Sequence, residues 1–512
     1  MNGALHAGMS HLMKEVTNLR VWDGSRLEGS TGLGFAAEKL SVSMVSRGIS
    51  SSLAFLTEDS ISTVRTGDST ASTGELSSST VDELLYASGG TVLLLKGQSL
   101  DELNLICPGS LSVLHEISLR VIRAGYTEEL LDAFTHAPCD VLDRSLSILQ
   151  VGRSLETGQV ISNEKVDWWT AEEMISRWIL ATKLVEKALV AMQMQLHAHS
   201  NGAFDRFKDE YLMAIANRST STLLRFAHGF TSTRSPEKLM CVLEMYEVLG
   251  DLVPSLLLVF TGQHSKELMS RLVEGVLAKL ARALRAMMAG LLTKIRTGVS
   301  SGTPPSATGV HPLTRCTMAC IGSLAPHHAA LDLILSSTGG DGDAEDVNSF
   351  GDLVSELIAS LEANLLEISS TLRGVDGGGL WHLFQANNTG FVLKHADVLE
   401  GDDWAGWRQS RVERHVRGYV QASWAPVVAC LKSGKGDVKI LGKFNSALEK
   451  AYSGHARCEV PDPALRAELR KAVSDEVVAA YEAYLLSHPR LRKFARYTTH
   501  SLAGLLSELF EG

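Results

Sequence analysis

The sequence predicts an all-α protein, built as an elongated rod of stacked irregular helical bundles. Hydrophobic residues make up 45% of the 512 residues and aromatic residues only 6%, so the apolar side chains are mainly Leu, Ala, Val and Ile. Long segments rich in Leu and Ala favour helices, whereas strands are enriched in β-branched and aromatic residues. Apolar residues also recur at the helical spacing i, i+3, i+4, without a fixed repeat period. Unequal helices that each bury one apolar stripe must pack against their neighbours.

The N-terminal region, residues 1–85, differs from the rest in composition. Ser, Thr and Gly are frequent there, as in residues 69–80 (STASTGELSSST). Short apolar patches without periodicity cannot offset the entropy that is lost on ordering the chain. We therefore expect residues 1–85 to be a low-complexity, largely disordered region with a short helix near residues 34–44. The helical rod is expected over residues 86–512.

Helical periodicity is clearest in residues 267–295. Leu272, Val276, Leu280 and Leu284 lie on one predicted face there, and Arg282 lies on the other. Six further segments show the same rhythm: 111–124, 171–197, 204–218, 236–249, 354–372 and 462–486. Turn-rich breaks between helices are predicted from Gly, Ser and Pro clusters at 298–305, 336–342, 374–379 and 433–436.

Three features favour a soluble intracellular protein. No apolar run approaches the 18 or so residues of a membrane span, and the richest, residues 252–260, contains Pro254. The N-terminus lacks the charged start and apolar core of a secretory signal. Seven cysteines without a Cys-x-x-Cys pair suit free thiols in a reducing compartment. We expect a cytoplasmic protein.

Charge is distributed unevenly along the chain. The formal net charge is −10, yet residues 405–512 hold 17 Lys and Arg against 11 Asp and Glu, a net of +6. Residues 1–404 therefore carry −16. This asymmetry concerns the partners of the protein rather than its fold, and it argues against the broad basic surface that nucleic-acid binding requires.

The most basic stretch is residues 490–497 (RLRKFARY). Four cations, Arg490, Arg492, Lys493 and Arg496, lie within seven residues, and a predicted amphipathic helix follows to the C-terminus. Two interpretations are open for such a cluster on an acidic protein. It binds an anionic partner, or it is a solvated helix end, where cations interact favourably with the negative C-terminal end of the helix dipole. A second group of lysines around a Gly-rich loop could join it if the fold brings the two together: Lys432, Lys435, Lys439 and Lys443.

Eight motif-like segments lie in order along residues 160–512, among them residues 311–315 (HPLTR) and residues 462–470 (DPALRAELR). Together the eight resemble the plant form of one family, the seventy-kilodalton subunit of the exocyst vesicle-tethering complex. Residues 311–315 resemble that family's helix start, and residues 462–470 resemble its "D-LR-ELR" segment. The terminal residues 509–512 (LFEG) are its usual plant ending. The other five are residues 235–256, 383–388, 399–404, 421–424 and 443–449.

The resemblance implies a tethering-complex-like helical array that is not an enzyme. It implies a peripheral protein that holds secretory vesicles at the plasma membrane during exocytosis, with other exocyst subunits and a small GTPase as partners, and without nucleic acid or a small-molecule substrate. Residues 493–497 (KFARY) resemble the family's "KYIKY", whose two cations are implicated in binding phosphatidylinositol 4,5-bisphosphate. Lys493 and Arg496 occupy those positions, and their spacing predicts one helical face. Residues 405–512 would form the basic, membrane-facing subdomain.

The N-terminal region departs from the family pattern. Family members begin with a long helical region that joins the exocyst core, whereas residues 1–85 show no heptads. The chain therefore resembles a divergent, N-terminally reduced member. An alternative function follows: a soluble helical adaptor or decoy in plant defence or receptor signalling that no longer joins the exocyst.

Several patterns that resemble catalytic or metal sites have simpler structural explanations. Asp402 and Asp403 before Trp404 suit a helix start better than an acid–base pair. Residues 298–302 (GVSSG) match a hydrolase elbow but lack a preceding strand. Residues 29–34 (GSTGLG) lack the Gly-Lys-Ser/Thr of a phosphate loop.

The remaining Cys, His and Trp groups are also expected to be structural. No common zinc-finger spacing matches that of Cys316, Cys320, His327 and His328. Trp168, Trp169 and Trp178 are predicted to pack within a long helix. The sequence therefore predicts no catalytic residue, bound metal or cofactor.

Overall fold

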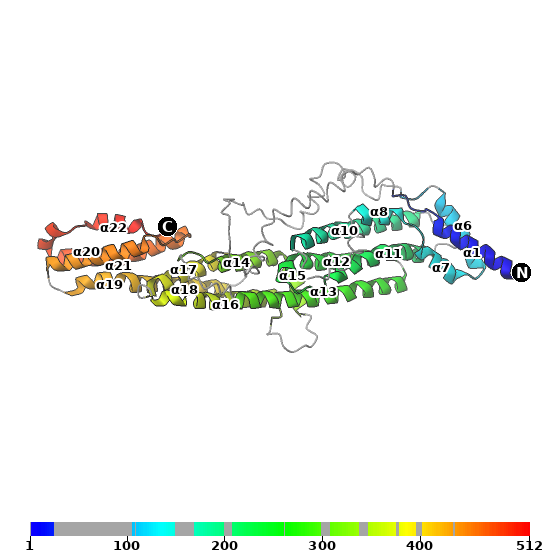
Figure 1. The fold of residues 1–512 in the computed structure, drawn as a ribbon. Helices are drawn as coiled ribbons and strands as arrows, with labels where there is room; N and C mark the ends of the chain where they lie inside the picture. Colours follow the sequence, from blue (N-terminus) through cyan, green and yellow to red (C-terminus); the bar gives the residue numbers. More distant parts are fainter. Residues whose placement is uncertain are drawn as a thin grey trace. The chain divides into compact units, whose positions relative to one another are not determined.

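The computed structural model divides the chain into two compact units, and the division falls within one long helix, after Gly290. Every regular element among the described residues is a helix, apart from two isolated bridges, Trp22 with Ile106 and Glu459 with Glu511. The all-α prediction is confirmed. The structure describes residues 2–24, 105–107, 109–148, 168–198, 207–260, 262–297, 308–336, 347–374, 378–395, 402–433 and 436–511 (Figure 1).

The first unit consists of long helices with shorter ones at its N-terminal end. In chain order these are α1 (Asn2–Asn18), α6 (Ser110–Arg123), α7 (Thr127–Thr135), α8 (Asp140–Ile148), α10 (Trp168–Ala198), α11 (Lys208–Gly229), the 3-10 helix η4 (Pro236–Lys238), α12 (Leu239–Val259) and most of α13 (Gln263–Thr297). Trp178 on α10 is fully buried, and its indole N–H donates to the Leu223 carbonyl of α11 at 2.9 Å. This tryptophan is a packing residue, as predicted; the side chains of Trp168 and Trp169 lie outside the described residues.

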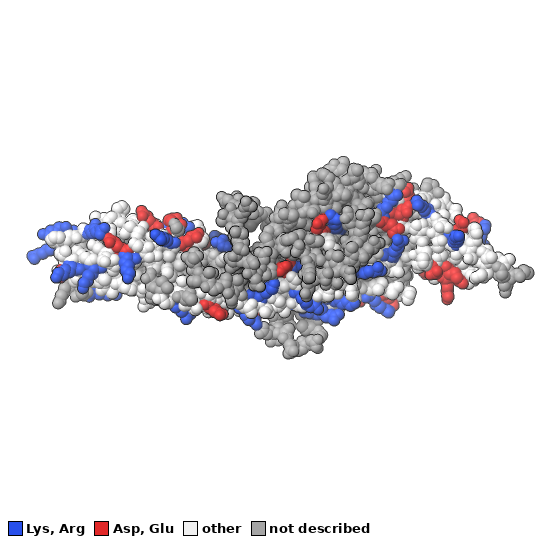
Figure 2. Space-filling view, viewed as in Figure 1, with Lys and Arg blue, Asp and Glu red and all other residues white. Residues whose placement is uncertain are grey.

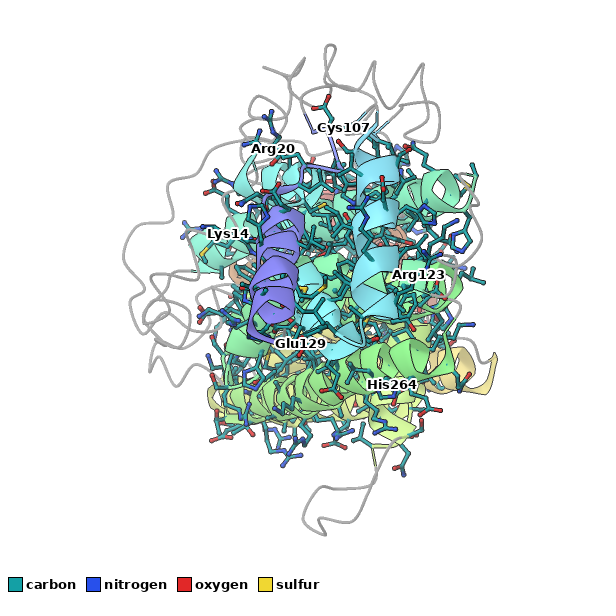
Figure 3. All side chains as sticks on the ribbon, turned by 90° about the vertical axis from the view of Figure 1, so that its right-hand side faces the viewer. Lys14, Arg20, Cys107, Arg123, Glu129 and His264 are labelled. Atoms are coloured by element: carbon teal, nitrogen blue, oxygen red, sulfur yellow. The ribbon has the colours of Figure 1, made fainter. Side chains whose placement is uncertain are left out.

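Helix α1 differs from the expectation of a largely disordered N-terminal region. It contacts α6 and α7, and Figure 3 shows it side by side with α6. The chain after α1 pairs with residues near α6, since Asp23 N–H donates to the Leu105 carbonyl at 2.8 Å and Cys107 N–H to the Val21 carbonyl at 2.9 Å. Trp22 is fully buried. The helix predicted near residues 34–44 lies outside the described residues.

The second unit also consists of helices. Its helices are α14 (Pro312–Leu324), η5 (Ala325–His327), α15 (His328–Ser336), α16 (Phe350–Ile368), η6 (Ser369–Gly374), α17 (Gly379–Lys394), α18 (Asp402–Tyr419), the π-helix η8 (Val420–Trp424), α19 (Ala425–Ala429), η9 (Cys430–Ser433), α20 (Val438–His455), α21 (Pro463–Ser487), η10 (Pro489–Phe494) and α22 (Thr499–Ser507). Helices end at Thr297, Ser336, Gly374 and Ser433, where the Gly- and Ser-rich clusters predicted breaks.

One helical stretch of the described chain, Pro312–Ser336, is long and apolar enough to span a membrane by length and composition. It is divided into α14, η5 and α15, and 44% of its most apolar window is buried inside the protein. Leu324, Leu331 and Ile334 on this stretch are at most 1% exposed. Core helices of many water-soluble proteins meet the same criteria, so the stretch is weak evidence for a membrane span.

Two paired asparagines hold the start of α14 against α17. The Asn388 side-chain oxygen accepts from the His311 backbone N–H at 2.8 Å and from the Thr314 hydroxyl at 2.6 Å. The Asn387 side-chain amide donates to the Thr308 carbonyl at 2.7 Å and to the Glu459 carbonyl at 3.1 Å. Both asparagines are buried. The HPLTR segment and the asparagine pair, which resembled separate family motifs, therefore form one hydrogen-bonded joint.

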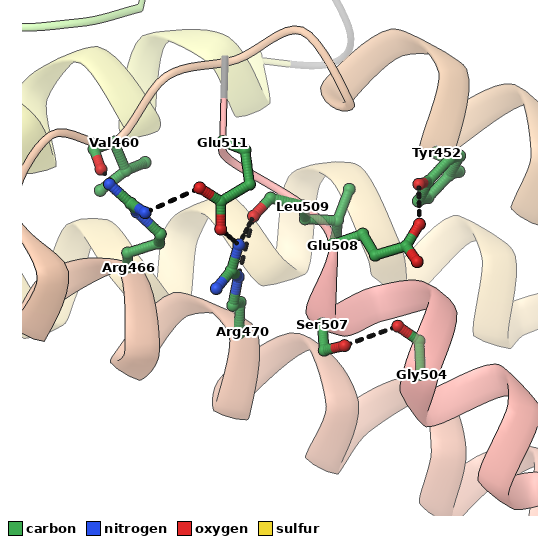
Figure 4. A network of polar contacts seen from close by, with 9 residues as sticks. All are labelled: Tyr452, Val460, Arg466, Arg470, Gly504, Ser507, Glu508, Leu509 and Glu511. Atoms are coloured by element: carbon green, nitrogen blue, oxygen red, sulfur yellow. Dashed lines mark hydrogen bonds and ion pairs between the residues drawn. The ribbon is translucent and has the colours of Figure 1, made fainter.

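The C-terminus is fastened to α21 in a similar way (Figure 4). The Arg470 guanidinium donates twice to the Leu509 carbonyl, at 2.8 and 2.6 Å, and once to the Glu511 carboxylate at 2.5 Å. Arg466 pairs with the same carboxylate at 2.9 Å. The hydrogen bond from Arg470 lowers the pKa of Glu511. Leu509 and Phe510 are fully buried, so the terminal family motif closes the core of the second unit.

Candidate functional site

The two predicted basic segments lie together at one end of the second unit. Gly436, just before α20, lies against His488, just after α21: a Cβ added to this glycine would come within 2.4 Å of the His488 ring. We call residues 432–443 and 489–498 the basic end. Figure 2 shows Lys and Arg side chains gathered over the end of the bundle formed by α20, α21 and α22. The contact between Gly436 and His488 therefore brings the two basic segments close together.

The basic end combines eight cations with a single carboxylate, Asp437. That carboxylate is the N-cap of α20, where it accepts from the Lys439 backbone N–H at 2.9 Å. Lys435 lies outside the described residues. The other seven cations are exposed: Lys432, Lys439, Lys443, Arg490, Arg492, Lys493 and Arg496.

The prediction that Lys493 and Arg496 share one helical face is wrong. The short helix η10 ends at Phe494, and Ala495 is extended with φ −69° and ψ 125°. Arg496 therefore lies beyond the helix, and its guanidinium pairs with Glu449 of α20, while the Lys493 amino group lies 5.0 Å from the centre of the Phe494 ring. The Arg496 and Glu449 side chains are 62% and 45% exposed. Exposed pairs of this kind contribute about 0–1 kcal/mol, so a phosphate group can compete for Arg496.

The backbone that carries these cations is held in place by α21 and α22. The Tyr481 hydroxyl donates to the Tyr497 carbonyl at 2.9 Å, and its ring stacks on Phe444 with 5.0 Å between the centroids. Burial raises the pKa of Tyr481. The Thr498 hydroxyl accepts from the Ser501 N–H at 3.0 Å and caps α22. The basic segment between α21 and α22 is therefore part of a loop whose backbone is held by hydrogen bonds to Tyr481 and by the cap of α22.

Lys450 is a further exposed cation that the sequence analysis missed. It lies on α20, eleven residues after Lys439 and seven after Lys443. These spacings place the three lysines along one side of the helix, since eleven residues complete about three turns. This lysine spacing could be read from the sequence, but Lys450 lies outside the Gly-rich loop on which the prediction was centred.

The other patterns considered in the sequence form no site among the described residues. Cys316 and Cys320 are buried on α14, and no group of three His, Cys, Asp or Glu in the described part of the chain is arranged to hold a metal ion. Helix α18 begins at Asp402, as the helix-start interpretation predicted, although the side chains of Asp402, Asp403 and Trp404 are not among those described. Residues 29–34 and 298–302 lie outside the described residues.

The chain is similar to plant proteins in sequence, and a yeast structure also matches it. It is 26% identical to exocyst complex component EXO70A1 of Arabidopsis thaliana over 440 residues, which cover 78% of this chain and 66% of the relative. It is 25% identical to component EXO70B1 of the same plant over 458 residues, which cover 84% and 72%. The chain thus spans about two thirds of the length of EXO70A1. A solved structure of the S. cerevisiae exocyst component Exo70p is 14% identical, with a TM-score of 0.46 and coverage of 81% of this chain and 83% of that one.

A family model covers most of the helical array. The model for the C-terminal part of the Exo70 exocyst complex subunit matches residues 176–508. The matched stretch includes α11 to α22, the asparagine joint and the basic end. Since this is well over half of the 512 residues, the chain belongs to the Exo70 family of exocyst subunits.

Proposed function

We propose that this protein is a non-enzymatic exocyst subunit that tethers secretory vesicles to the plasma membrane and binds phosphatidylinositol 4,5-bisphosphate through its basic end. The observation that carries the proposal is the concentration of eight cations and one capped carboxylate on two adjacent segments. Family membership supports the place in the exocyst. The other exocyst subunits, a small GTPase and the anionic plasma membrane would be its partners.

The charge of the basic end suits a polyanionic headgroup. Each Lys or Arg near an anionic leaflet contributes about 1 kcal/mol, so a cluster of this size can hold a peripheral protein without a lipid anchor. Arg490, Arg492 and Arg496 can each offer two parallel N–H donors to a phosphate, whereas the lysines act as mobile point charges. Residues 1–404, with a net charge of −16, would be repelled by the same leaflet.

Vesicle sedimentation over a range of salt concentrations tests the lipid part of the proposal. We expect strong binding to vesicles that contain phosphatidylinositol 4,5-bisphosphate, weaker binding with phosphatidylserine and none with phosphatidylcholine alone. Binding should fall steeply as salt rises, because exposed charges are screened within about 8 Å at physiological ionic strength. Equal binding to neutral and phosphoinositide vesicles, or binding that does not change with salt, would contradict the proposal.

Co-purification from plant cells tests the place in the exocyst. We expect the tagged protein to recover the other exocyst subunits. The adaptor hypothesis, which rests on the composition of residues 1–85, predicts instead a single receptor-like or effector partner without exocyst subunits. That second result would replace the tethering function while leaving the lipid measurement unaffected.

A further inference from the structure

Three large apolar side chains are exposed within the basic end or directly next to it. Val438, the first residue of α20, is 45% exposed; Leu486, in the last turn of α21, is 58% exposed; and Phe494, the last residue of η10, is 52% exposed. The contact between Gly436 and His488 brings the start of α20 and the end of α21 together. The three side chains therefore belong to neighbouring segments of one end of the bundle.

Their exposure is selective. The adjacent apolar residues Leu485 and Leu491 are only 8% and 7% exposed and belong to the core of the second unit. Among the described residues of that unit, only Leu333 and Leu366 are other large apolar side chains with comparable exposure. Leu486 and Phe494 thus extend outward beside neighbours that extend inward, on the segments that carry or adjoin the cations of the tail.

We propose that Phe494, Leu486 and Val438 insert into the boundary between headgroups and acyl chains of an anionic bilayer, while the surrounding cations bind the headgroups. This inference rests on the proposed lipid-binding function and adds an apolar component to it. Interfacial binding in general combines buried apolar side chains with Lys and Arg that remain at headgroup level. Lys493, whose amino group lies 5.0 Å from the Phe494 ring centre, can extend from the apolar layer to the phosphates.

The arrangement of charge favours a bilayer over a protein partner. The core of a protein–protein interface is depleted of charged residues. At the basic end Val438 lies between the capping carboxylate Asp437 and Lys439, and Phe494 directly follows Lys493. A membrane surface accommodates this mixture, because it offers phosphates and acyl chains within the same few ångströms of depth.

Serine substitutions separate insertion from electrostatic attraction. We expect Phe494→Ser combined with Leu486→Ser to weaken binding to phosphatidylinositol 4,5-bisphosphate vesicles by about tenfold or more, from the apolar area no longer buried. The salt dependence should be unchanged, because every cation is retained. Wild-type protein should raise the surface pressure of a lipid monolayer of the same composition, and the double variant should not. Leu333→Ser is the matched control: Leu333 is 65% exposed on α15, and its replacement should behave as wild type in both measurements.

Phe494→Trp gives a second readout that does not depend on weakened binding. The new indole should be quenched by brominated acyl chains beyond the quenching of the native tryptophans in the wild-type protein. Failure of wild-type protein to bind phosphoinositide vesicles would overturn the proposed function itself. Normal vesicle binding by the serine variant, with no rise in monolayer pressure for wild type and no added quenching at position 494, would overturn insertion alone. Loss of a protein partner with vesicle binding intact would assign the apolar residues to that partner instead.

Discussion

We expect Lys493→Glu combined with Arg496→Glu to abolish binding to vesicles that contain phosphatidylinositol 4,5-bisphosphate. Each replacement changes the local charge by two, so the basic end loses four units of positive charge. At about 1 kcal/mol for each charge near an anionic leaflet, the loss is about 4 kcal/mol, or roughly a thousandfold in the binding constant. Both side chains are exposed, so the fold should persist. Vesicle sedimentation, with circular dichroism to confirm folding, measures the effect.

The matched control reverses two cations elsewhere in the second unit. Arg457, beyond the end of α20, and Lys471, in the first half of α21, are both exposed. Their conversion to glutamate changes the net charge of the protein by the same amount but leaves the basic end intact. We expect this control to bind nearly as well as wild type. Equal losses in the two variants would mean that net charge, rather than a localised site, governs binding.

Replacing Glu449 should strengthen vesicle binding rather than weaken it. Its carboxylate pairs with Arg496 and accepts from the Tyr497 hydroxyl at 3.4 Å. Glu449→Gln removes a negative charge beside the basic end and releases the guanidinium. We expect vesicle binding to strengthen by several-fold, since one charge contributes about 1 kcal/mol. A weaker interaction in this variant would show that Glu449 is needed to position Arg496.

The helical class and the helix limits could be predicted because they depend on local sequence. Periodic Leu and Ala predicted α13, α16 and α21, and Gly- and Ser-rich clusters predicted the helix ends at Thr297 and Ser336. Helix α1 was missed because its residues were grouped with the Ser- and Gly-rich stretch that follows them, and Trp22 beyond it becomes buried only through contacts with chain some 80 residues later. Propensity alone is a weak guide where tertiary packing provides most of the helix stability.

The composition of the basic end was predicted, but its geometry was not. Residues 490–497 suit a helix by composition, yet the chain leaves η10 after Phe494 because Tyr481, Leu491 and the Thr498 cap hold it in another path. Gly436 and His488 are 52 residues apart in sequence, and their close contact is possible only because glycine has no Cβ. No local pattern encodes such an approach. The exposed Phe494 was likewise invisible, because its neighbours decide whether an apolar residue is buried.

We expect Asn388→Leu to lower the stability of the second unit by about 2–4 kcal/mol, since it leaves the buried Thr314 hydroxyl and the half-buried His311 N–H without their acceptor. Asn388 is 1% exposed. Its oxygen accepts from His311 N–H and Thr314 hydroxyl, and its amide donates to the Phe384 carbonyl at 2.8 Å. For a unit of this size the melting temperature should fall by about 5–15 °C, which differential scanning calorimetry would measure.

Two further variants test whether the fall in melting temperature comes from the lost hydrogen bonds of Asn388 or from the introduction of a leucine. Asn217 on α11 is exposed, so Asn217→Leu should leave the melting temperature nearly unchanged. Adding Thr314→Val to Asn388→Leu should recover part of the lost stability, because replacing both members of a buried pair costs less than orphaning one. An unchanged melting temperature in Asn388→Leu, or no recovery in the double variant, would mean that the asparagine joint does not stabilise the contact between α14 and α17.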